Sequence, residues 1–339
     1  MQMQQVKNIL ILYSLMPANP PYLHDLGDFP DLIQIVATER GIIPQLVEKD
    51  YWIMHCLHGL TTLGFIFELK GGTSLSKGFG IIERFSEDID IHIDPVADST
   101  TPSFKVFTGK NQTKKSAHIN SRKDYYDWLA ENISIDGIES VERDIAFDDG
   151  DYYRSGGIRL NYKSHYDGLP GLKDGILLEV GFDDTAPNSE VDIASWAYEK
   201  ASASPISFFD NCAKKIKCYH PGYTFVEKLQ TVSTKYRQQR ESGDFPVNFM
   251  RHYYDLAKLL DHADVQSFIG TPEYHERKKV RFRTGDNLNI SENDAFLIAD
   301  TDVRETYKNA FETTQPLYYG SPPDFDEILD KIQEQAVNL

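Results

Sequence analysis

Polar and apolar residues alternate most regularly between Asp88 and Asp94, where isoleucine occupies every second position. A period of two is that of a β-strand, and it places the acids on one face and the isoleucines on the other. The same alternation predicts strands at 156–163 and 174–184, and a short apolar run between glycines predicts a buried strand at 65–69. The N-terminal half is therefore expected to contain a β-sheet.

Elsewhere, apolar residues recur every three or four positions, which is the spacing of an amphipathic helix. This spacing occurs within 32–57 and returns at 225–236 and 249–260. A chain of 339 residues fits about two domains. We therefore predict an α+β protein with N-terminal helices and a sheet in residues 1–205 and a mainly helical domain in residues 206–339.

The lengths of the apolar runs and the cysteine spacing indicate where in the cell the protein is expected. The most apolar runs, such as 9–15 and 175–180, are far shorter than the roughly 20 residues that a membrane helix needs. The N-terminal run has too thin a basic region and no clear cleavage pattern for a signal peptide. Three cysteines without CxxC spacing indicate neither a disulfide framework nor a zinc site. We expect a cytoplasmic protein with no membrane contact.

The net charge of −17 argues against a surface that coats nucleic acid, because non-specific binding depends on neutralising phosphates with Lys and Arg. Any contact with RNA must therefore be local. Two basic stretches, 105–123 and 275–283, are candidates, together with Arg84. The alternative is that these charges are solvated.

Two glycines precede the acidic strand. Gly71 and Gly72 follow one predicted strand and open a predicted helix. At such a turn backbone N–H groups and the helix N-terminus attract phosphate. A Walker A motif is excluded because Lys77 precedes Gly78. For the glycines alone, the alternative is an ordinary tight turn.

Asp88 and Asp90 lie two residues apart on the predicted strand. Their side chains then point the same way, with Cβ atoms roughly 7 Å apart, which suits hard cations bound through oxygen. Paired Mg²⁺ ions, or Mn²⁺, can activate an attacking hydroxyl and stabilise a leaving pyrophosphate. The alternative is the solvated face of an edge strand, and the neighbouring glycine turn favours the metal site.

The order of these motifs resembles a known family. GGTSLSK (71–77) followed by RFSEDIDI (84–91) is similar to the AbiEii/AbiGii toxin family of nucleotidyltransferases, which includes the MenT toxins and belongs to the DNA polymerase β superfamily. EKDYW (48–52), EKLQTVSTKYR (227–237) and RHYYDL (251–256) resemble its other motifs. The resemblance implies a polymerase β-type domain with a mixed sheet, a helical C-terminal domain, and an NTP substrate.

The resemblance also assigns roles to residues. The nucleotide-binding residues implied are Gly71, Gly72, Ser74, Lys77 and Ser86. The catalytic residues implied are Asp88, Asp90, Lys228 and Asp255, of which the first two bind the metals and Lys228 neutralises phosphate charge. His252 stands where the family often has a second acid. Without the resemblance, Lys228 would be a solvated helix flank, and Arg251 with Asp255 a surface ion pair.

Polymerase β-type sites usually use a third carboxylate from a later strand. Glu179 is the candidate metal ligand, because it lies in an otherwise apolar run where an unpaired acid is costly. Asp183, on the same predicted face, is its rival. The alternative is an ion pair between Glu179 and Arg159 on the adjacent strand.

The resemblance predicts transfer of a nucleotide from NTP to an RNA acceptor, with the tRNA 3′ end as the first candidate. The context would be a toxin–antitoxin or phage-defence system with a cognate antitoxin. Transfer to a small hydroxylated molecule or to a protein side chain stays open. A non-catalytic nucleotide-binding protein on the same fold is a further alternative, and the intact glycines and aspartates speak against it.

Overall fold

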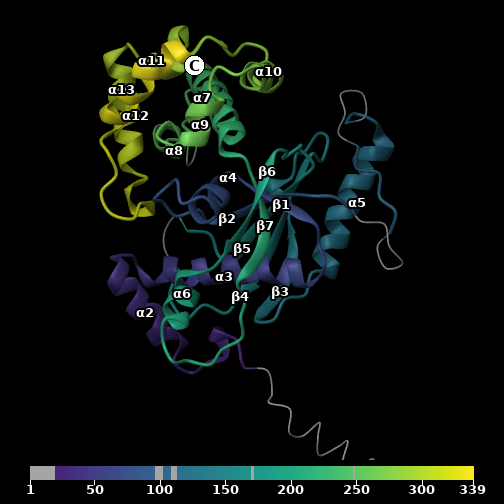
Figure 1. The fold of residues 1–339 in the computed structure, drawn as a ribbon. Helices are drawn as coiled ribbons and strands as arrows, with labels where there is room; N and C mark the ends of the chain where they lie inside the picture. The colour runs from purple at the N-terminus through teal and green to yellow at the C-terminus, as the bar shows by residue number, and fades with distance from the viewer. Residues whose placement is uncertain (1–19, 96–101, 108–112, 169–171, 247–248) are drawn as a thin grey trace, which may run out of the picture.

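The computed structural model describes residues 20–95, 102–107, 113–168, 172–246 and 249–339 (Figure 1). The N-terminal run that was weighed as a signal peptide lies outside these residues, as does Lys110 of the first basic stretch. None of the described helices is both long enough and apolar enough to cross a membrane. All three cysteines are buried and free, as expected from their spacing.

A seven-stranded mixed sheet forms the centre of the N-terminal part. Its strand order is β3-β4-β5-β2-β1-β7-β6, and the β2/β5 and β1/β7 pairs are parallel while the other neighbours are antiparallel. The strands are β1 (Phe67–Lys70), β2 (Asp88–Ile93), β3 (Ile138–Asp144), β4 (Ser155–Tyr162), β5 (Ile176–Gly181), β6 (Asn188–Ile193) and β7 (Ala213–Tyr219). The predicted α+β class and mixed sheet are confirmed.

Helices cover the sheet on two sides (Figure 1). The N-terminal part contributes α2 (Phe29–Arg40), α3 (Pro44–Thr62), α4 (Gly71–Thr73), α5 (Ser116–Asn132) and α6 (Trp196–Ser202). The C-terminal part contributes α7 (Pro221–Ser242), α8 (Arg251–Leu259), α9 (Ala263–Phe268), α10 (Pro272–Arg281), α11 (Asp294–Leu297), α12 (Thr301–Glu312) and α13 (Phe325–Gln335). Figure 1 shows α7–α13 gathered on the opposite side of the sheet from α2, α3 and α6.

The alternation in β2 decides which face of the sheet is packed. Ile89 and Ile91 are fully buried in one apolar core with residues of α3 and α5, such as Leu57 and Leu129. A strand that buries every second residue must present the others to the opposite face. The acids of β2 therefore point toward the helices of the C-terminal part.

The sheet continues past the predicted domain boundary at residue 205. β7 lies inside the part predicted to be helical, yet it pairs with β1 on one side and β6 on the other. Three lysines, Lys214, Lys215 and Lys217, interrupt its apolar pattern, and the buried positions are Ala213, Ile216, Cys218 and Tyr219. The mainly helical part begins with α7 at Pro221.

A segment of the N-terminal part is built into the helical part. Leu75 and Ile82 are buried in the same apolar core as α7, α8 and α13 rather than in the core under the sheet. The backbone N–H of Phe85 donates to the carbonyl of Leu317 over 2.7 Å, and Tyr319 donates in return to Glu83 over 2.9 Å. The chain after the glycine turn is therefore fixed between the two parts.

Ile82→Ala is expected to lower the free energy of unfolding by about 2–4 kcal/mol, because it opens a cavity in the helical core. Ile81→Ala is the matched control, since Ile81 is only partly buried against that core and should cost less. Urea unfolding of both variants measures the difference. Equal, small losses would contradict the placement of this segment in the helical core.

Candidate active site

Three carboxylates share one face of the sheet. Asp88 and Asp90 lie on β2, and Glu179 lies on β5 directly beside Asp90 in the parallel register. Paired residues of neighbouring strands point to the same face, so all three side chains converge there. They line a cavity of about 200 Å³ between the sheet and helices α7 and α8.

The glycine turn forms another wall of this cavity. Gly71 has a φ of +71°, and a Cβ there would lie 2.9 Å from Asp90 Oδ2. A Cβ on Gly72 would lie 2.5 Å from Ser86 Oγ. The Thr73 hydroxyl donates to the backbone carbonyl of Asp88 over 2.6 Å and so ties the turn to β2. Any side chain at these two glycines would fill the space beside the acids.

Cations line the opposite wall. Arg84, Lys228 of α7 and Arg251 of α8 all border the cavity. Behind them, Asp255 is fully buried and accepts hydrogen bonds from Arg84 Nε and Nη2 at 2.7 and 2.6 Å and from Lys228 Nζ at 2.6 Å. Burial alone would raise the pKa of Asp255, but Arg84 and Lys228 hold it well below its usual range. Asp255 does not border the cavity, so it positions two cations that do.

Arg251 is a residue of the cavity that sequence reasoning missed. The ion pair with Asp255 that was its alternative reading is not formed, and no carboxylate of the described residues pairs with it. The only signal was its place at the head of the RHYYDL motif. Beside it, His252 also borders the cavity and its buried Nδ1 has no hydrogen-bond partner among the described residues. Burial and the nearby Lys228 keep the pKa of His252 low, so the ring is neutral.

Glu179 holds a proton more readily than an ordinary glutamate. Burial, together with the charge of Asp90, raises its pKa to about 7. The alternative ion pair with Arg159 is wrong, because Arg159 binds Asp144 instead. The rival Asp183 lies beyond the end of β5, where it pairs with Arg281 at 3.2 Å with 55% of its side chain exposed. Glu179 is therefore the third carboxylate on the cavity.

The donor set fits a hard divalent cation, since it consists of carboxylate oxygens. Asp88 Oδ1 is buried without a hydrogen-bond partner among the described residues, and the nearest cation is Lys173 Nζ at 3.9 Å. Lys70 Nζ lies 3.0 Å from Asp90 Oδ1 and draws that carboxylate toward the end of β1. The ligand atoms of the three acids do not all lie within 4.8 Å of one another. Sites for two ions about 3.5–4 Å apart need this wider span.

A different trio has its ligand atoms within 4.8 Å of one another: His24, Asp25 and Asp136. Both aspartates are exposed, and the His24 Nδ1 is already engaged by the Tyr51 hydroxyl at 2.7 Å. The trio lies apart from the catalytic cavity, none of whose lining residues belong to it. Exposed acids commonly gather without an ion, so we assign no role to it.

Two of the residues expected to bind nucleotide lie elsewhere. Lys77 Nζ is 3.0 Å from Asp50 Oδ1 and 4.6 Å above the ring of Trp196. Ser74 is fully buried and does not border the cavity. Both residues belong to the π-helical turn at Ser74–Gly78. Gly71, Gly72 and Ser86 remain as the cavity-lining members of that predicted set.

The EKDYW motif of α3 supports the acidic side of the cavity. Lys49 is almost fully buried, lies 3.7 Å from Glu87, and donates to the backbone carbonyl of Lys173. These two contacts fix the residues that precede Asp88 and β5.

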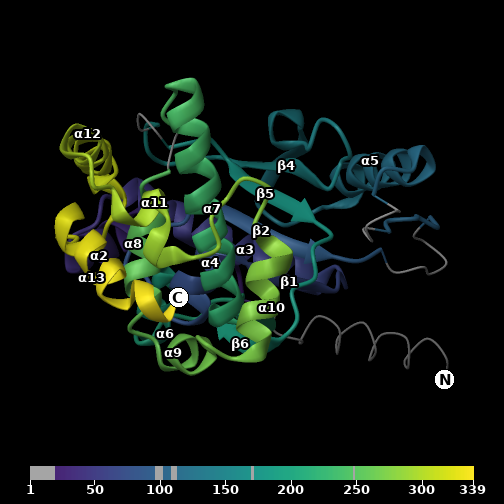
Figure 2. The ribbon, with the colours of Figure 1, turned by 90° about the horizontal axis from the view of Figure 1, so that it is seen from above.

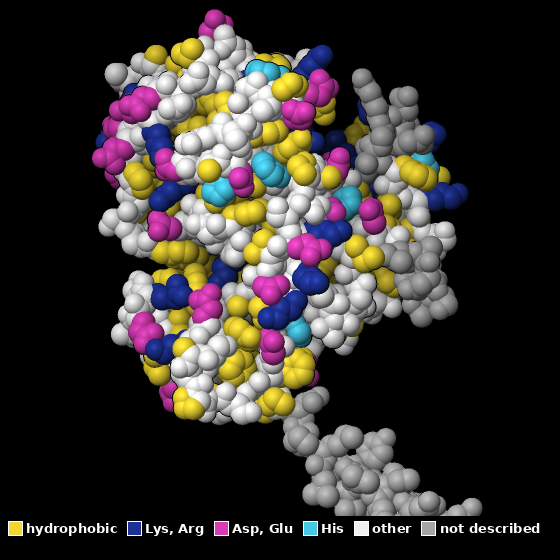
Figure 3. Space-filling view, viewed as in Figure 1, with side chains coloured by type: hydrophobic (Ala, Val, Ile, Leu, Met, Phe, Trp, Pro, Cys, Tyr) yellow, Lys and Arg dark blue, Asp and Glu magenta, His cyan; other side chains and the backbone are white. Residues whose placement is uncertain are grey.

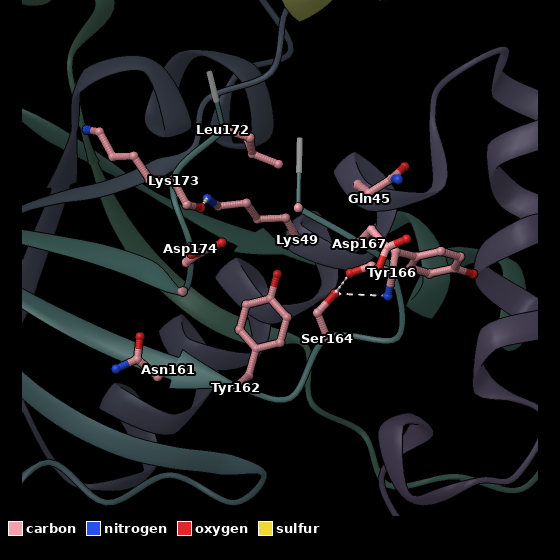
Figure 4. A pocket seen from close by; sticks show the side chains of 12 residues that line it. Gln45, Lys49, Asn161, Tyr162, Ser164, Tyr166, Asp167, Leu172, Lys173 and Asp174 are labelled. Atoms are coloured by element: carbon pink, nitrogen blue, oxygen red, sulfur yellow. Dashed lines mark hydrogen bonds between the residues drawn. The ribbon is translucent and has the colours of Figure 1, made fainter. Parts of the chain in front are cut away.

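A second, polar cavity of about 170 Å³ opens beside Lys49. In Figure 4 the Lys49 amino group meets the Lys173 backbone, while the Lys173 side chain extends away from that cavity. Burial lowers the pKa of Lys49 to about 8.

Many of the basic residues proposed to contact RNA form hydrogen bonds or ion pairs within the protein. In the first stretch Arg122 is fully buried and donates to backbone carbonyls, including that of Tyr152. Lys123 pairs with Asp127. In the second stretch the paired residues and their partners are Arg277 with Glu227, Lys278 with the Leu339 carbonyl, and Arg281 with Asp183. The exposed basic residues that remain are Lys105, Lys114, Lys115, Lys279 and Arg283. Figure 3 shows basic and acidic side chains interspersed on the face in view, without a large field of one sign.

Comparison with known families agrees with this geometry. The family described as "Nucleotidyl transferase AbiEii toxin, Type IV TA system" matches residues 62–331. The chain belongs to this family. The matched range contains the glycine turn, the three acids and the cationic wall of the cavity. No curated protein sequence matches the chain. This AbiEii-family protein therefore belongs to the nucleotidyltransferase toxins of type IV toxin–antitoxin systems.

In the AbiEii-family protein, Glu179→Gln is expected to raise the thermal midpoint in EDTA, and to raise it more near pH 8 than near pH 5. The pKa of Glu179 is about 7 when folded, against an ordinary value of 4.5. Folding thus favours the protonated form, and the wild type loses that stability as pH rises through about 7. Glutamine stays neutral throughout.

Asp183→Asn is the control for this measurement. Despite burial, Arg281 and Lys70 lower the pKa of Asp183, so its charged form is the stabilising one. The asparagine variant should lose stability near pH 8. If Glu179→Gln shifts the midpoint equally at both pH values, Glu179 is not the protonated member of the acidic face.

Asp255→Asn is expected to cost about 3–5 kcal/mol of unfolding free energy, because it leaves Arg84 and Lys228 buried without their counter-charge. The exposed pair of Lys258 with Glu83, at 2.8 Å, supplies the control. Glu83→Gln should cost less than about 1 kcal/mol. Denaturant unfolding compares the two variants, and a similar small loss in both would show that Asp255 does not hold the cationic wall together.

Proposed function

We propose that this protein transfers a nucleotide from an NTP to a hydroxyl of RNA, with two Mg²⁺ ions held by Asp88, Asp90 and Glu179. The observation that carries the proposal is the single cavity on which these acids, the Gly71–Gly72 turn and a cationic wall face one another. Acids suit metal ions and cations suit phosphates, so an NTP–metal complex matches both walls. Mn²⁺ could replace Mg²⁺ on the same oxygen ligands.

Bound Mg²⁺ would activate the attacking hydroxyl and stabilise the leaving pyrophosphate. Asp88 and Asp90 would hold both ions, and Glu179 would lose its proton to join them. The open backbone at Gly71 and Gly72 would admit the triphosphate, with Ser86 beside it. Glu179 is next to Asp90 on the β5 side, so the acceptor hydroxyl would approach from there.

The cationic wall would bind the triphosphate. Lys228 and Arg251 reach the cavity from α7 and α8, and Arg84 reaches it from the segment before β2. Because Asp255 fixes Lys228 and Arg84 in place, it would act as a positioning residue rather than touch the substrate. We do not include Ser74 or Lys77, since their side chains are engaged or buried away from the cavity.

RNA, with the tRNA 3′ end as the first acceptor to test, is proposed from the resemblance to the MenT toxins. The exposed Lys105, Lys114 and Lys115 give a local basic surface for it. A small hydroxylated acceptor is the second candidate. It is favoured by the net charge of −17 and by the internal pairing of Arg277, Lys278 and Arg281. A cognate antitoxin would complete the system, and direct contact with it is not part of the proposal.

The test incubates purified protein with each NTP, Mg²⁺ and total tRNA, and sequences the RNA 3′ ends. Wild type should add nucleotides, while Asp88→Asn and Asp90→Asn should lower the rate by at least about a thousandfold, since losing a catalytic metal removes several kcal/mol of charge stabilisation. Asp94→Asn is the matched control, because Asp94 follows the same strand but is 69% exposed and pairs with His92.

Unchanged 3′ ends, together with pyrophosphate release in the presence of a small hydroxylated acceptor, would move the second candidate into first place. Equal activity of Asp90→Asn and Asp94→Asn would contradict the metal assignment itself.

A further inference from the structure

Helix α10 turns two of its arginines inward, toward the catalytic cavity. Arg277 Nη2 lies 2.5 Å from Glu227 Oε1, and Glu227 borders that cavity. Arg281 lies 3.2 Å from Asp183 through Nη1 and 3.8 Å from Glu227 through Nε. In the view from above of Figure 2, α10 lies over the region of β1 and β6, and in Figure 1 it lies above these strands, beside α7. The helix therefore lies over the end of the sheet at which the glycine turn begins.

The surface that α10 covers is formed by the last residues of β1 and β7. Leu69 pairs with Cys218 in the parallel register, so Lys70 and Tyr219 follow side by side at the same end. Lys70 directly precedes Gly71 of the turn. Tyr219 is fully buried, and the guanidinium carbon of Arg277 lies 5.8 Å from the centre of its ring. Glu227, which Arg277 contacts, lines the same cavity as Gly71 and Gly72, so the cluster adjoins the glycine wall.

Three buried polar atoms in this cluster lack a hydrogen-bond partner among the described residues: Tyr219 Oη, Arg277 Nε and Arg281 Nε. Each can donate a hydrogen bond, and leaving a buried donor unpaired costs about 1–3 kcal/mol. Native structures keep few such groups, and a cluster of them marks a place where a ligand supplies the acceptors. The ligand that fits three donors beside two guanidinium groups is a phosphate.

The charges of the cluster are balanced without a ligand, because Lys70, Arg277 and Arg281 face Asp90, Asp183 and Glu227. The unpaired donors are therefore the feature that needs an explanation. A pair of arginines used only to fasten α10 to the sheet would leave no buried hydroxyl without a partner. The two explanations therefore differ in what Tyr219 should do.

We infer that Arg277, Arg281 and Tyr219 form a subsite for the β- and γ-phosphates of the NTP, at the β1 end of the catalytic cavity. This inference rests on the proposed function for the identity of the ligand. The triphosphate then lies between the Gly71–Gly72 turn and the cationic wall of the cavity. The acids receive its end nearest the sugar, and α10 contacts the part that leaves as pyrophosphate. Glu227 joins the subsite to the cavity and holds Arg277 in place.

The test is isothermal titration of the full chain with inorganic pyrophosphate in the presence of Mg²⁺, without NTP or RNA. Arg277→Gln and Arg281→Gln should each weaken pyrophosphate binding by about tenfold, the loss of one charged hydrogen bond. Arg281→Lys should recover part of the binding because it keeps the charge. Lys279→Gln is the matched control, since Lys279 lies on the same helix but is exposed, and its binding should equal that of wild type.

Tyr219→Phe separates the subsite from a purely structural role. Removing an unpaired buried hydroxyl should leave the thermal midpoint equal to or above that of wild type, while pyrophosphate binding falls by about threefold or more. Wild-type pyrophosphate binding in Tyr219→Phe and both glutamine variants, with only their thermal midpoints changed, would overturn the inference. Pyrophosphate binding that depends on these side chains, in a protein that transfers no nucleotide, would contradict the proposed function and support the subsite.

Discussion

Three carboxylates on one buried face repel one another, and the groups around them reduce that repulsion. Asp88, Asp90 and Glu179 point into one cavity because β2 and β5 are parallel and in register. Burial and the charge of Asp90 raise the pKa of Glu179 to about 7. Lys70 and Lys173 approach the other two acids. Such a face is costly for folding, so its presence at the centre of the sheet favours a role in binding cations.

In the cationic wall the positive charges repel one another, and Asp255 offsets this repulsion. Its single buried carboxylate binds both Arg84 and Lys228, so these two cations can lie close together at the cavity. Arg84 comes from the segment whose neighbours Leu75 and Ile82 belong to the helical core. The helical part therefore fixes the distance between the wall of cations and the wall of acids, and the cavity depends on both parts of the chain.

The sequence carried enough information for the acids and the glycines, because alternation and turn geometry act within a few residues. It also singled out Glu179, which lies beside Asp90 on the cavity, because an unpaired acid in an apolar strand is costly. It could not place Lys77 and Ser74, because the contact of Lys77 with Asp50 and the burial of Ser74 depend on tertiary packing. Arg251 and the inward arginines of α10 were missed as site residues for the same reason: whether a basic residue on a helix meets solvent or a cavity depends on how that helix packs. The three lysines of β7 interrupt its apolar pattern, so the sequence did not predict this strand or its pairing with β1 and β6.

The central claim is that the three carboxylates act together as one site for divalent metal. Titration with Mn²⁺, followed by electron paramagnetic resonance of the free ion, tests it without any assumption about the acceptor. The account predicts that wild type binds Mn²⁺, that Asp90→Asn and Glu179→Gln each weaken binding by at least about tenfold, and that Asp183→Asn leaves binding unchanged. Equal Mn²⁺ affinity in all four proteins would contradict it.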